Sequence, residues 1–246
     1  MELLKNYARG FVKNVKNAHW RGLTEAACVF PCPGCREGLS EQGWNCFCDE
    51  CLGRILRITG PHCPGCGGPQ DGILAYCSKC MRIGVRPWRD AYAVMELDPF
   101  GLELVHRYKY GGQVELARAF AALGAELIRR SGAEFDVIAP VPLHWTRYCT
   151  RGFNQAHLFC LLLGRELGIP VRRLLVRRRA TRRQARLNRE QRLNNLTDAF
   201  ALRRGAAVVG RKILLVDDVL TTGATLTEAC RPLTGAEVSI MVIGRR

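Results

Sequence analysis

The sequence predicts an α/β fold with a parallel sheet, joined to a smaller cysteine-rich region. Three observations lead to this prediction. Apolar runs of strand length alternate with helical patterns between residues 91 and 243. One of these runs, residues 213–216, ends in two aspartates and a loop of small residues. Four Cys-x-x-Cys pairs lie between residues 32 and 80, upstream of the alternating region.

Composition limits the classes of protein that fit. The 246 residues are 48% hydrophobic, which is enough for a sizeable core. No apolar run approaches the roughly 18–20 residues of a membrane helix, and the first residues lack the apolar stretch of a signal peptide. We therefore expect a cytoplasmic protein without a transmembrane segment. The net charge of +15 is unevenly spread, with +4 over residues 1–90 and +11 over the remainder.

The first predicted unit, residues 1–29, is an amphipathic helix. Its apolar residues recur at roughly helical spacing among lysines and arginines, at Leu3, Leu4, Tyr7, Phe11, Val12 and Val15. A basic helix of this kind packs on its own domain or lies on a membrane surface. Packing is the favoured interpretation.

Residues 30–85 are predicted to bind two structural zinc ions. The turn Cys-Pro-Gly-Cys recurs after 31 residues and its partner pair after 29, so the unit is duplicated. A two-residue spacing lets both thiolates of a turn face one ion, and two turns complete a tetrahedral site. The predicted ligand sets are Cys32, Cys35, Cys48 and Cys51, and then Cys63, Cys66, Cys77 and Cys80.

Other uses of these cysteines are possible on the sequence alone. Iron–sulfur clusters or redox thiols are the alternatives to zinc, whereas disulfides do not persist in a cytosolic protein. Cys46 competes with Cys48 as a ligand, but only Cys48 has the spacing of the other pairs. Cys28 and His62 are predicted to be bystanders.

Residues 90–246 are predicted to form the α/β domain. Helical spacing of apolar residues marks helices over residues 114–130 and 154–167. The helix after residue 225 is predicted to be short because Pro232 interrupts it. Strands are predicted over residues 91–97, 102–108, 136–142, 171–176, 212–216 and 237–243.

The acidic pair Asp217 and Asp218 marks the candidate ligand site. It follows a buried strand, and parallel sheets bind ligands at the carboxyl ends of their strands. The loop that comes next can close its backbone N–H groups around one anion, and Thr225 is expected to cap the following helix. An acidic pair beside an anion cradle suits a ribose 5-phosphate. An ordinary strand end, or the magnesium site of another nucleotide enzyme, is the alternative. The predicted loop residues are Thr221, Thr222, Gly223, Ala224 and Thr225.

Three cations are candidates for further phosphate contacts. Arg147 and Arg151 follow one predicted strand and precede a helix, where each can grip phosphate oxygens in bidentate fashion. The alternative is pairing with surface acids. Lys109 precedes a Tyr-Gly-Gly turn and either reaches a phosphate or is an ordinary surface lysine.

A run of eight arginines with one acid, Glu190, extends from Arg177 to Arg192. Such a run favours polyphosphate or a nucleic-acid backbone, and a solvated helix face is the alternative. A polar stretch of this length between strands is typical of a functional loop, such as a lid.

The stretch from Lys212 to Thr225 resembles the phosphoribosyl-pyrophosphate (PRPP) motif of type I phosphoribosyltransferases, with four hydrophobic residues, two acids and a TTGxT-type loop. Taken with the cysteine pairs, the chain resembles the competence protein F (ComF) family, a double zinc ribbon joined to a phosphoribosyltransferase-like domain. Further matching stretches are residues 107–112, 140–143, 151–156 and 199–200, with Thr181, Gln184, Arg192, Asn194 and Asn195.

The resemblance implies an enzyme that carries out magnesium-dependent phosphoribosyl transfer from PRPP, and it implies roles for several residues. Asp217 and Asp218 would hold the ribose hydroxyls, directly or through Mg²⁺, and act in catalysis. Arg147, Arg151 and Lys109 would face the pyrophosphate. The acceptor substrate is not indicated. The resemblance also implies a role in natural transformation, beside a competence helicase and single-stranded DNA. Two rival hypotheses are a non-enzymatic DNA- or ligand-binding component and a structural module with a vestigial pocket.

Overall fold

The computed structural model describes residues 31–38, 46–71, 74–143, 154–178 and 198–246. The predicted helix over residues 1–29, the loop arginines Arg147 and Arg151, and the arginine run beyond residue 178 lie outside the described residues. No helix in the described ranges has both the length and the apolar character needed to cross a membrane. The predicted boundaries at residues 30, 85 and 90 stay predictions.

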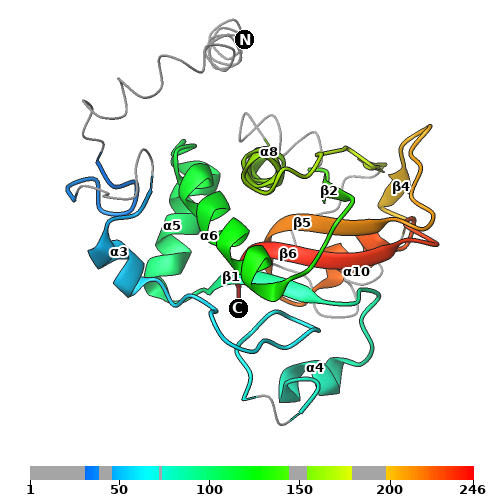
Figure 1. Ribbon diagram of the computed structural model, residues 1–246, viewed down its shortest axis with the longest axis horizontal. Helices are drawn as coiled ribbons and strands as arrows, with labels where there is room; N and C mark the ends of the chain where they lie inside the picture. The colour runs from blue at the N-terminus through cyan, green and yellow to red at the C-terminus, as the bar shows by residue number, and fades with distance from the viewer. Residues whose placement is uncertain (1–30, 39–45, 72–73, 144–153, 179–197) are drawn as a thin grey trace, which may run out of the picture.

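A four-stranded parallel sheet forms the centre of the molecule (Figure 1). Its strands pair in parallel in the order β1-β6-β5-β2. In that order they span Ala91–Glu96, Glu237–Arg245, Lys212–Leu220 and Val137–Pro140. The predicted α/β class with a parallel sheet is confirmed.

The sheet is buried on both faces. Along β5, Leu214 and Val216 belong to one hydrophobic core, and Ile213 and Leu215 belong to a second core. Successive side chains of a strand point to opposite faces, so each core covers one face of the sheet. This is why the strand is a continuous apolar run rather than an alternating one.

The helix after β1 corrects one prediction. Residues 102–108, predicted as a strand, lie in α5 (Pro99–Tyr110). The Asp98 side chain caps this helix by accepting a hydrogen bond from the Gly101 amide at 2.7 Å, and Pro99 lies in the first turn. Its buried apolar residues recur at helical spacing, at Phe100, Leu104, Val105 and Tyr108.

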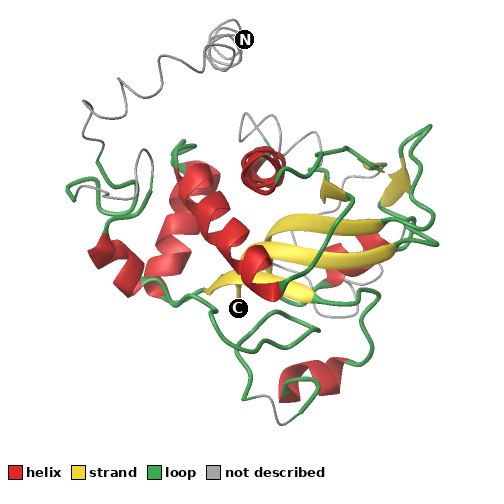
Figure 2. Ribbon diagram, viewed as in Figure 1, coloured by secondary structure: helices red, strands yellow, loops and turns green. Residues whose placement is uncertain are grey.

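Two further helices share the core on the α5 face of the sheet (Figure 2). They are α6 (Leu116–Ser131) and α8 (Gln155–Leu167), and both confirm the predicted helices. Each ends at a glycine in the left-handed region, Gly132 and Gly168. Asn154 caps α8 by accepting a hydrogen bond from the His157 amide at 3.3 Å.

The opposite face is covered by smaller elements. They are α10 (Ala224–Cys230) and an antiparallel pair, β3 (Leu175–Arg177) with β4 (Phe200–Leu202). The strand predicted over residues 171–176 therefore starts later than expected. As predicted, α10 is short and ends before Pro232.

Two short helices each begin directly after a cysteine of one cluster. Helix α3 (Asp49–Arg54) follows Cys48, and helix α4 (Ser78–Ile83) follows Cys77. In Figure 1 α3 lies beside α5, whereas α4 lies apart from α5 and nearer to β1. The duplicated units of the sequence therefore occupy different positions around the sheet.

Candidate functional site

The acidic pair lies within β5 rather than after it. The prediction ended the strand at residue 216, but β5 continues to Leu220 and pairs with β6 along its last residues. Pairing with β2 ends at Val216, so the acidic pair lies beyond the last β2 partner, Pro140. Asp217 and Asp218 therefore stand at the carboxyl edge of the sheet, as expected for a ligand site.

Lys109 of α5 reaches this edge. Its Nζ lies 3.0 Å from Oδ2 of Asp218, and each side chain is 15% exposed. A lysine and an aspartate far apart in sequence thus form a mostly buried ion pair. The interpretation of Lys109 as an ordinary surface lysine is wrong, whereas its contact with a phosphate stays a prediction.

Asp217 is half-buried, and its charge is unfavourable. Burial and the neighbouring charge of Asp218 raise the pKa of Asp217 to about 7, against the lowering effects of the Asp218 amide, Lys109 and Arg177. The Asp218 amide donates to Asp217 Oδ1 at 2.9 Å. Two adjacent carboxylates with one close lysine form a site that favours additional positive charge or hydroxyl donors.

The lysine is held by a bridge between α5 and α8. The Tyr108 hydroxyl donates to the Gln155 carbonyl at 2.7 Å, and the Gln155 side-chain amide donates to the Lys109 carbonyl at 3.3 Å. Tyr108 and Gln155 are both fully buried. Burial, together with the charge of Asp218, raises the pKa of Tyr108 well above its ordinary value, so the hydroxyl remains a donor. Tyr108 and Gln155 therefore position Lys109.

The small-residue loop encloses a hollow of about 20 Å³, which Asp217 and residues 219–226 line. Gly223 has a φ of 81° and precedes α10, so a side chain there would strain the backbone. The prediction that Thr225 caps this helix is wrong. Thr225 lies inside α10, and Thr222 Oγ1 accepts a hydrogen bond from the Ala224 amide at 3.4 Å.

Arg86 is a residue of this site that the sequence analysis missed. It donates from Nη1 to the Thr222 carbonyl at 3.0 Å, and a Cβ atom at Gly223 would lie 2.7 Å from the same nitrogen. Its guanidinium also lies 5.1 Å from the Trp88 ring centroid. Arg86 follows the second cysteine cluster, and no pattern in the sequence connects it with a loop 136 residues away.

Arg177 is the other described arginine near the acidic pair, since its charge lowers the pKa of Asp217. Its Cζ lies 5.2 Å from the ring centroid of Phe200. The sequence placed Arg177 at the start of the arginine run. The predicted phosphate contacts of Arg147 and Arg151 lie outside the described residues.

The eight predicted metal ligands form two groups of four, as the spacing indicated. Within each group the sulfur atoms all lie within 4.8 Å of one another. Zinc binds thiolates at about 2.3 Å, so the sulfurs of a tetrahedral site are about 3.8 Å apart. The Cys35–Cys48 and Cys66–Cys77 sulfur pairs are separated by 3.8 and 3.7 Å. Both clusters therefore fit zinc.

Backbone amides point at these sulfurs and favour the thiolate form that zinc binds. The amides of Gly34 and Cys48 donate to Cys32 Sγ, both at 3.2 Å. The Gly38 amide donates to Cys35 Sγ at 3.2 Å, and this bond is the main reason why the pKa of Cys35 falls to about 7.

The glycine of each Cys-Pro-Gly-Cys turn has a steric explanation. A Cβ atom at Gly34 would lie 2.7 Å from Cys51 Sγ, and one at Gly65 would lie 2.9 Å from Cys80 Sγ. Only glycine lets the turn approach the fourth sulfur of its cluster. The repeated glycine therefore belongs to the metal site.

Three further residues near the clusters in the sequence were considered as ligands: Cys46, His62 and Cys28. Cys46 belongs to neither group of four sulfurs, which supports Cys48 as the ligand. His62 Nε2 instead lies 3.2 Å from Asp90 Oδ1. Cys28 lies outside the described residues.

Comparison with known proteins places this architecture among named relatives. Residues 162–244 match the family described as phosphoribosyl transferase domain. The chain is 34% identical to the DNA utilization protein YhgH of Salmonella typhimurium over 205 residues, which are 81% of this chain and 88% of the relative. It is 32% identical both to competence protein ComFC of Bacillus subtilis (76% and 77% covered) and to competence protein F of Haemophilus influenzae (83% and 90% covered).

Proposed function

Because this chain belongs to the competence protein F (ComF) family, we propose that it binds PRPP with Mg²⁺ and takes part in DNA uptake. The match to the phosphoribosyl transferase domain supports the choice of ligand. The names of the relatives, which refer to competence and to DNA utilization, support the choice of process.

The Lys109–Asp218 ion pair is the observation that carries the proposed ligand. Both side chains are mostly buried. The free energy lost when two such charges leave water can exceed the free energy gained from their attraction, so a buried ion pair by itself adds little stability. A ligand with both hydroxyl and phosphate groups uses the two partners together. The hydroxyls donate to Asp218, and a phosphate accepts from Lys109. PRPP carries both kinds of group within one molecule.

Each part of the site has one task in this proposal. Asp217 and Asp218 accept hydrogen bonds from the ribose hydroxyls, and the loop over residues 221–225 holds the 5-phosphate through its backbone amides. Lys109, with Arg147 and Arg151, neutralises the pyrophosphate. Tyr108 and Gln155 hold the end of α5 that carries Lys109.

The acidic pair also fits a magnesium ion. Mg²⁺ prefers oxygen ligands and is usually held by one or two carboxylates together with substrate phosphates. When bound, it supplies charge neutralisation on the pyrophosphate. The reaction class is displacement of pyrophosphate at ribose C1 by an acceptor nucleophile. The chain contributes the positioning of C1 and the stabilisation of separating charges.

Calorimetric titration tests the ligand. PRPP with Mg²⁺ should bind with one ligand per chain, and Asp218→Asn and Lys109→Met should each weaken binding at least tenfold, about 1.4 kcal/mol. Glu126→Gln, which removes an exposed carboxylate on α6, is the matched control and should leave the affinity unchanged. Absence of binding by the unmodified protein would sink the proposal.

Turnover needs its own measurement. PRPP is incubated with a panel of bases and amines, and pyrophosphate release is followed. Release that depends on one acceptor and is lost in Asp218→Asn identifies a phosphoribosyltransferase. Binding without release from any acceptor identifies a ligand-binding component instead.

A second candidate function is binding of single-stranded DNA. The net charge of +15 and the arginine run favour it. Affinity for an oligothymidylate should rise as salt falls, and replacement of Arg182, Arg183 and Arg186 by Ala should weaken it. Unchanged binding in that variant would remove the arginine run from the candidate interface.

A further inference from the structure

A cationic pocket lies at the edge of the sheet opposite to the acidic pair. Its volume is about 510 Å³, and its lining includes Val137, the first residue of β2, and Arg211, which directly precedes β5. Asp217 stands six residues beyond Arg211, about 20 Å away at the roughly 3.3 Å that a strand rises per residue. The pocket therefore does not belong to the candidate PRPP site.

The charge of this pocket is unbalanced. Five arginines line it and no acidic residue does, while buried Val137 and Leu174 lie among them. Within the described part of the chain, none of the five guanidinium groups takes part in an ion pair. Because guanidinium stays charged at any physiological pH, the lining carries about five positive charges. The five residues are Arg172, Arg173, Arg203, Arg204 and Arg211.

The backbone brings like charges together. Strands β3 and β4 pair antiparallel with Leu175 opposite Leu202, and the Arg203 amide donates to the Leu174 carbonyl at 2.8 Å. Continued by the same register, Arg203 lies opposite Leu174 and Arg173 lies opposite Arg204, so both segments bring positive charge to the same place. Like charges across an antiparallel pair destabilise it. A bound anion would remove this repulsion.

The walls of the pocket are anchored to the sheet. The Ile138 amide donates to the Pro170 carbonyl at 3.0 Å, and the Arg172 amide donates to the Ile138 carbonyl at 3.0 Å. On the other side, the Ala206 amide closes a turn by donating to the Arg203 carbonyl at 3.0 Å. Both arginine-bearing segments are thus held in place before any ligand arrives.

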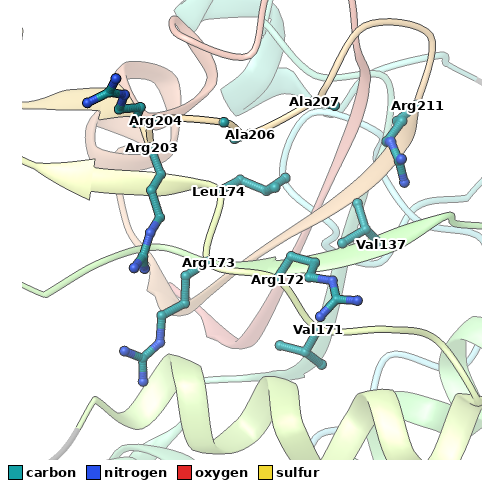
Figure 3. A pocket seen from close by; sticks show the side chains of 11 residues that line it. Val137, Val171, Arg172, Arg173, Leu174, Arg203, Arg204, Ala206, Ala207 and Arg211 are labelled. Carbon is teal, nitrogen blue, oxygen red and sulfur yellow. The ribbon is translucent and has the colours of Figure 1, made fainter.

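Four of the arginines lie on two sides of Leu174. In Figure 3, Arg173 and Arg203 extend in the same direction on one side of Leu174, and Arg172 and Arg211 lie on its other side. Arg204 points away from these four side chains. A ligand with several linked phosphates can contact arginines on both sides of Leu174.

The remaining lining points to a compact ligand rather than to a nucleic-acid strand. It consists of valine, leucine, alanine and glycine, with no aromatic side chain. Proteins that hold single strands usually stack the bases on aromatic rings. The volume of 510 Å³ lies within the range of roughly 300–1,000 Å³ found for small-molecule sites.

We propose that this pocket is a second anion site, which binds a compact polyphosphate. Inorganic tripolyphosphate and the phosphate chain of a nucleoside triphosphate share the required chemistry. The proposal is independent of the PRPP site, since no residue is common to both.

Calorimetry with inorganic tripolyphosphate, without added Mg²⁺, tests the site. The unmodified protein should bind it, and the double variant Arg172→Gln with Arg203→Gln should bind at least tenfold more weakly. The charge-matched control is Arg82→Gln with Arg129→Gln, two exposed arginines on α4 and α6, and it should keep the affinity. Asp218→Asn should keep it as well. Adenosine triphosphate in the same assay distinguishes a nucleotide from an inorganic chain, according to which binds more tightly.

Thermal unfolding provides a second readout, because a ligand that binds only the folded state raises the melting temperature. Tripolyphosphate should raise it for the unmodified protein and not for the pocket variant. Equal affinity of the pocket variant and the unmodified protein would overturn the proposal. So would orthophosphate binding as tightly as tripolyphosphate, or loss of binding in Asp218→Asn. If the double variant loses more affinity for oligothymidylate than for tripolyphosphate, the pocket is part of a nucleic-acid surface instead.

Discussion

The two cysteine clusters have the same sequence pattern and the same sulfur geometry, but they pack against different parts of the molecule. The first cluster is part of the core that covers the α5 face of the sheet, and the second is part of the core on the other face. The two copies share the four-cysteine arrangement, but the residues that pack around each copy differ. From this difference we propose that the first copy supports the fold and that the second supports the proposed ligand edge.

The first cluster is tied to α5 and α6. Arg107 of α5 donates to the carbonyls of Pro33 and Gly34, at 2.7 and 2.6 Å. Phe47, which directly precedes the ligand Cys48, packs on Phe120 of α6 with ring centroids 5.9 Å apart. These contacts join the cysteine turn to the helices that cover the sheet.

The second cluster is tied to β1 and to the ends of β5 and β6. A Cβ atom at Gly67 would lie 2.8 Å from the Ala93 amide, so the turn packs directly on β1. Lys79 donates to the Arg246 carbonyl at 2.9 Å, and Arg86 holds the Thr222 carbonyl. This cluster therefore borders the loop proposed to bind the 5-phosphate.

Removing one ligand from each cluster should have the largest effect and tests the comparison directly. Cys51 is fully buried in the first core, so Cys51→Ser should lose one zinc ion and lower the free energy of unfolding by at least about 4 kcal/mol. Cys80→Ser should also lose one zinc ion, with a smaller loss of stability but weaker PRPP binding. Metal analysis and thermal unfolding measure these effects.

Cys46→Ser is the matched control for both cysteine variants. It should keep two zinc ions per chain, because Cys46 belongs to neither group of sulfurs. Equal loss of stability in the Cys51 and Cys80 variants, with equal affinity for PRPP, would contradict the division of roles.

Arg107→Met should have the next largest effect, since it keeps the aliphatic stem and removes the donor to two carbonyls of the first cysteine turn. Hydrogen bonds from a charged donor contribute about 1.5–3 kcal/mol, so we expect a loss of about 2 kcal/mol. Urea unfolding provides the measurement. Glu103→Gln, which removes only the exposed ion-pair partner of Arg107, should change stability by less than about 0.5 kcal/mol.

The sequence predicted the local features well and the long-range ones poorly. Cysteine spacing identified both groups of four sulfurs, because four cysteines at fixed intervals leave few arrangements. The apolar run of β5 and the acids after it located the site's edge. The strand predicted over residues 102–108 was wrong, because Asp98 caps a helix there and Pro99 lies in its first turn.

Contacts between distant residues could not be predicted from spacing. Lys109 meets Asp218, and Arg86 meets Thr222, only because the sheet order brings β1, β6 and β5 together. The arginines of the cationic pocket are divided in the same way between residues before β3, after β4 and before β5. Their positive charge could be predicted from the sequence. That these side chains lie around one pocket could not.

Asp217→Asn should reveal a stability cost at the ligand edge. An acid whose folded-state pKa is raised to about 7 binds its proton more tightly in the folded state than in the unfolded state. Its carboxyl therefore lowers stability increasingly from pH 4 to pH 7, and fully above that. The variant should be more stable than the unmodified protein at pH 8, by about 1–2 kcal/mol, since one pKa unit corresponds to about 1.4 kcal/mol and solvent reaches part of the Asp217 side chain.

The stability gain should become small near pH 4, where the unmodified carboxyl is fully protonated in the folded state and about half protonated in the unfolded state. PRPP binding by the unmodified protein should weaken as pH falls from 8 to 6, because protons compete for Asp217. Unfolding curves at the three pH values measure the first effect and calorimetry measures the second. A variant less stable than the unmodified protein at pH 8 would contradict the assignment of this cost to Asp217.

Arg86→Met should have the smallest effect on stability and is the most specific test of how the second cluster supports the ligand loop. The residue is partly exposed, so losing its bond to the Thr222 carbonyl should cost less than about 1 kcal/mol of folding free energy. Affinity for PRPP should nevertheless fall about fivefold to tenfold, because the loop loses the contact that holds it beside Gly223. The control is Arg89, which lies on the same segment as Arg86 and forms an exposed ion pair with Glu237. Arg89→Gln breaks this ion pair and should leave the affinity for PRPP unchanged. If both variants bind PRPP like the unmodified protein, the second cluster acts on stability alone and the two clusters do not differ in role.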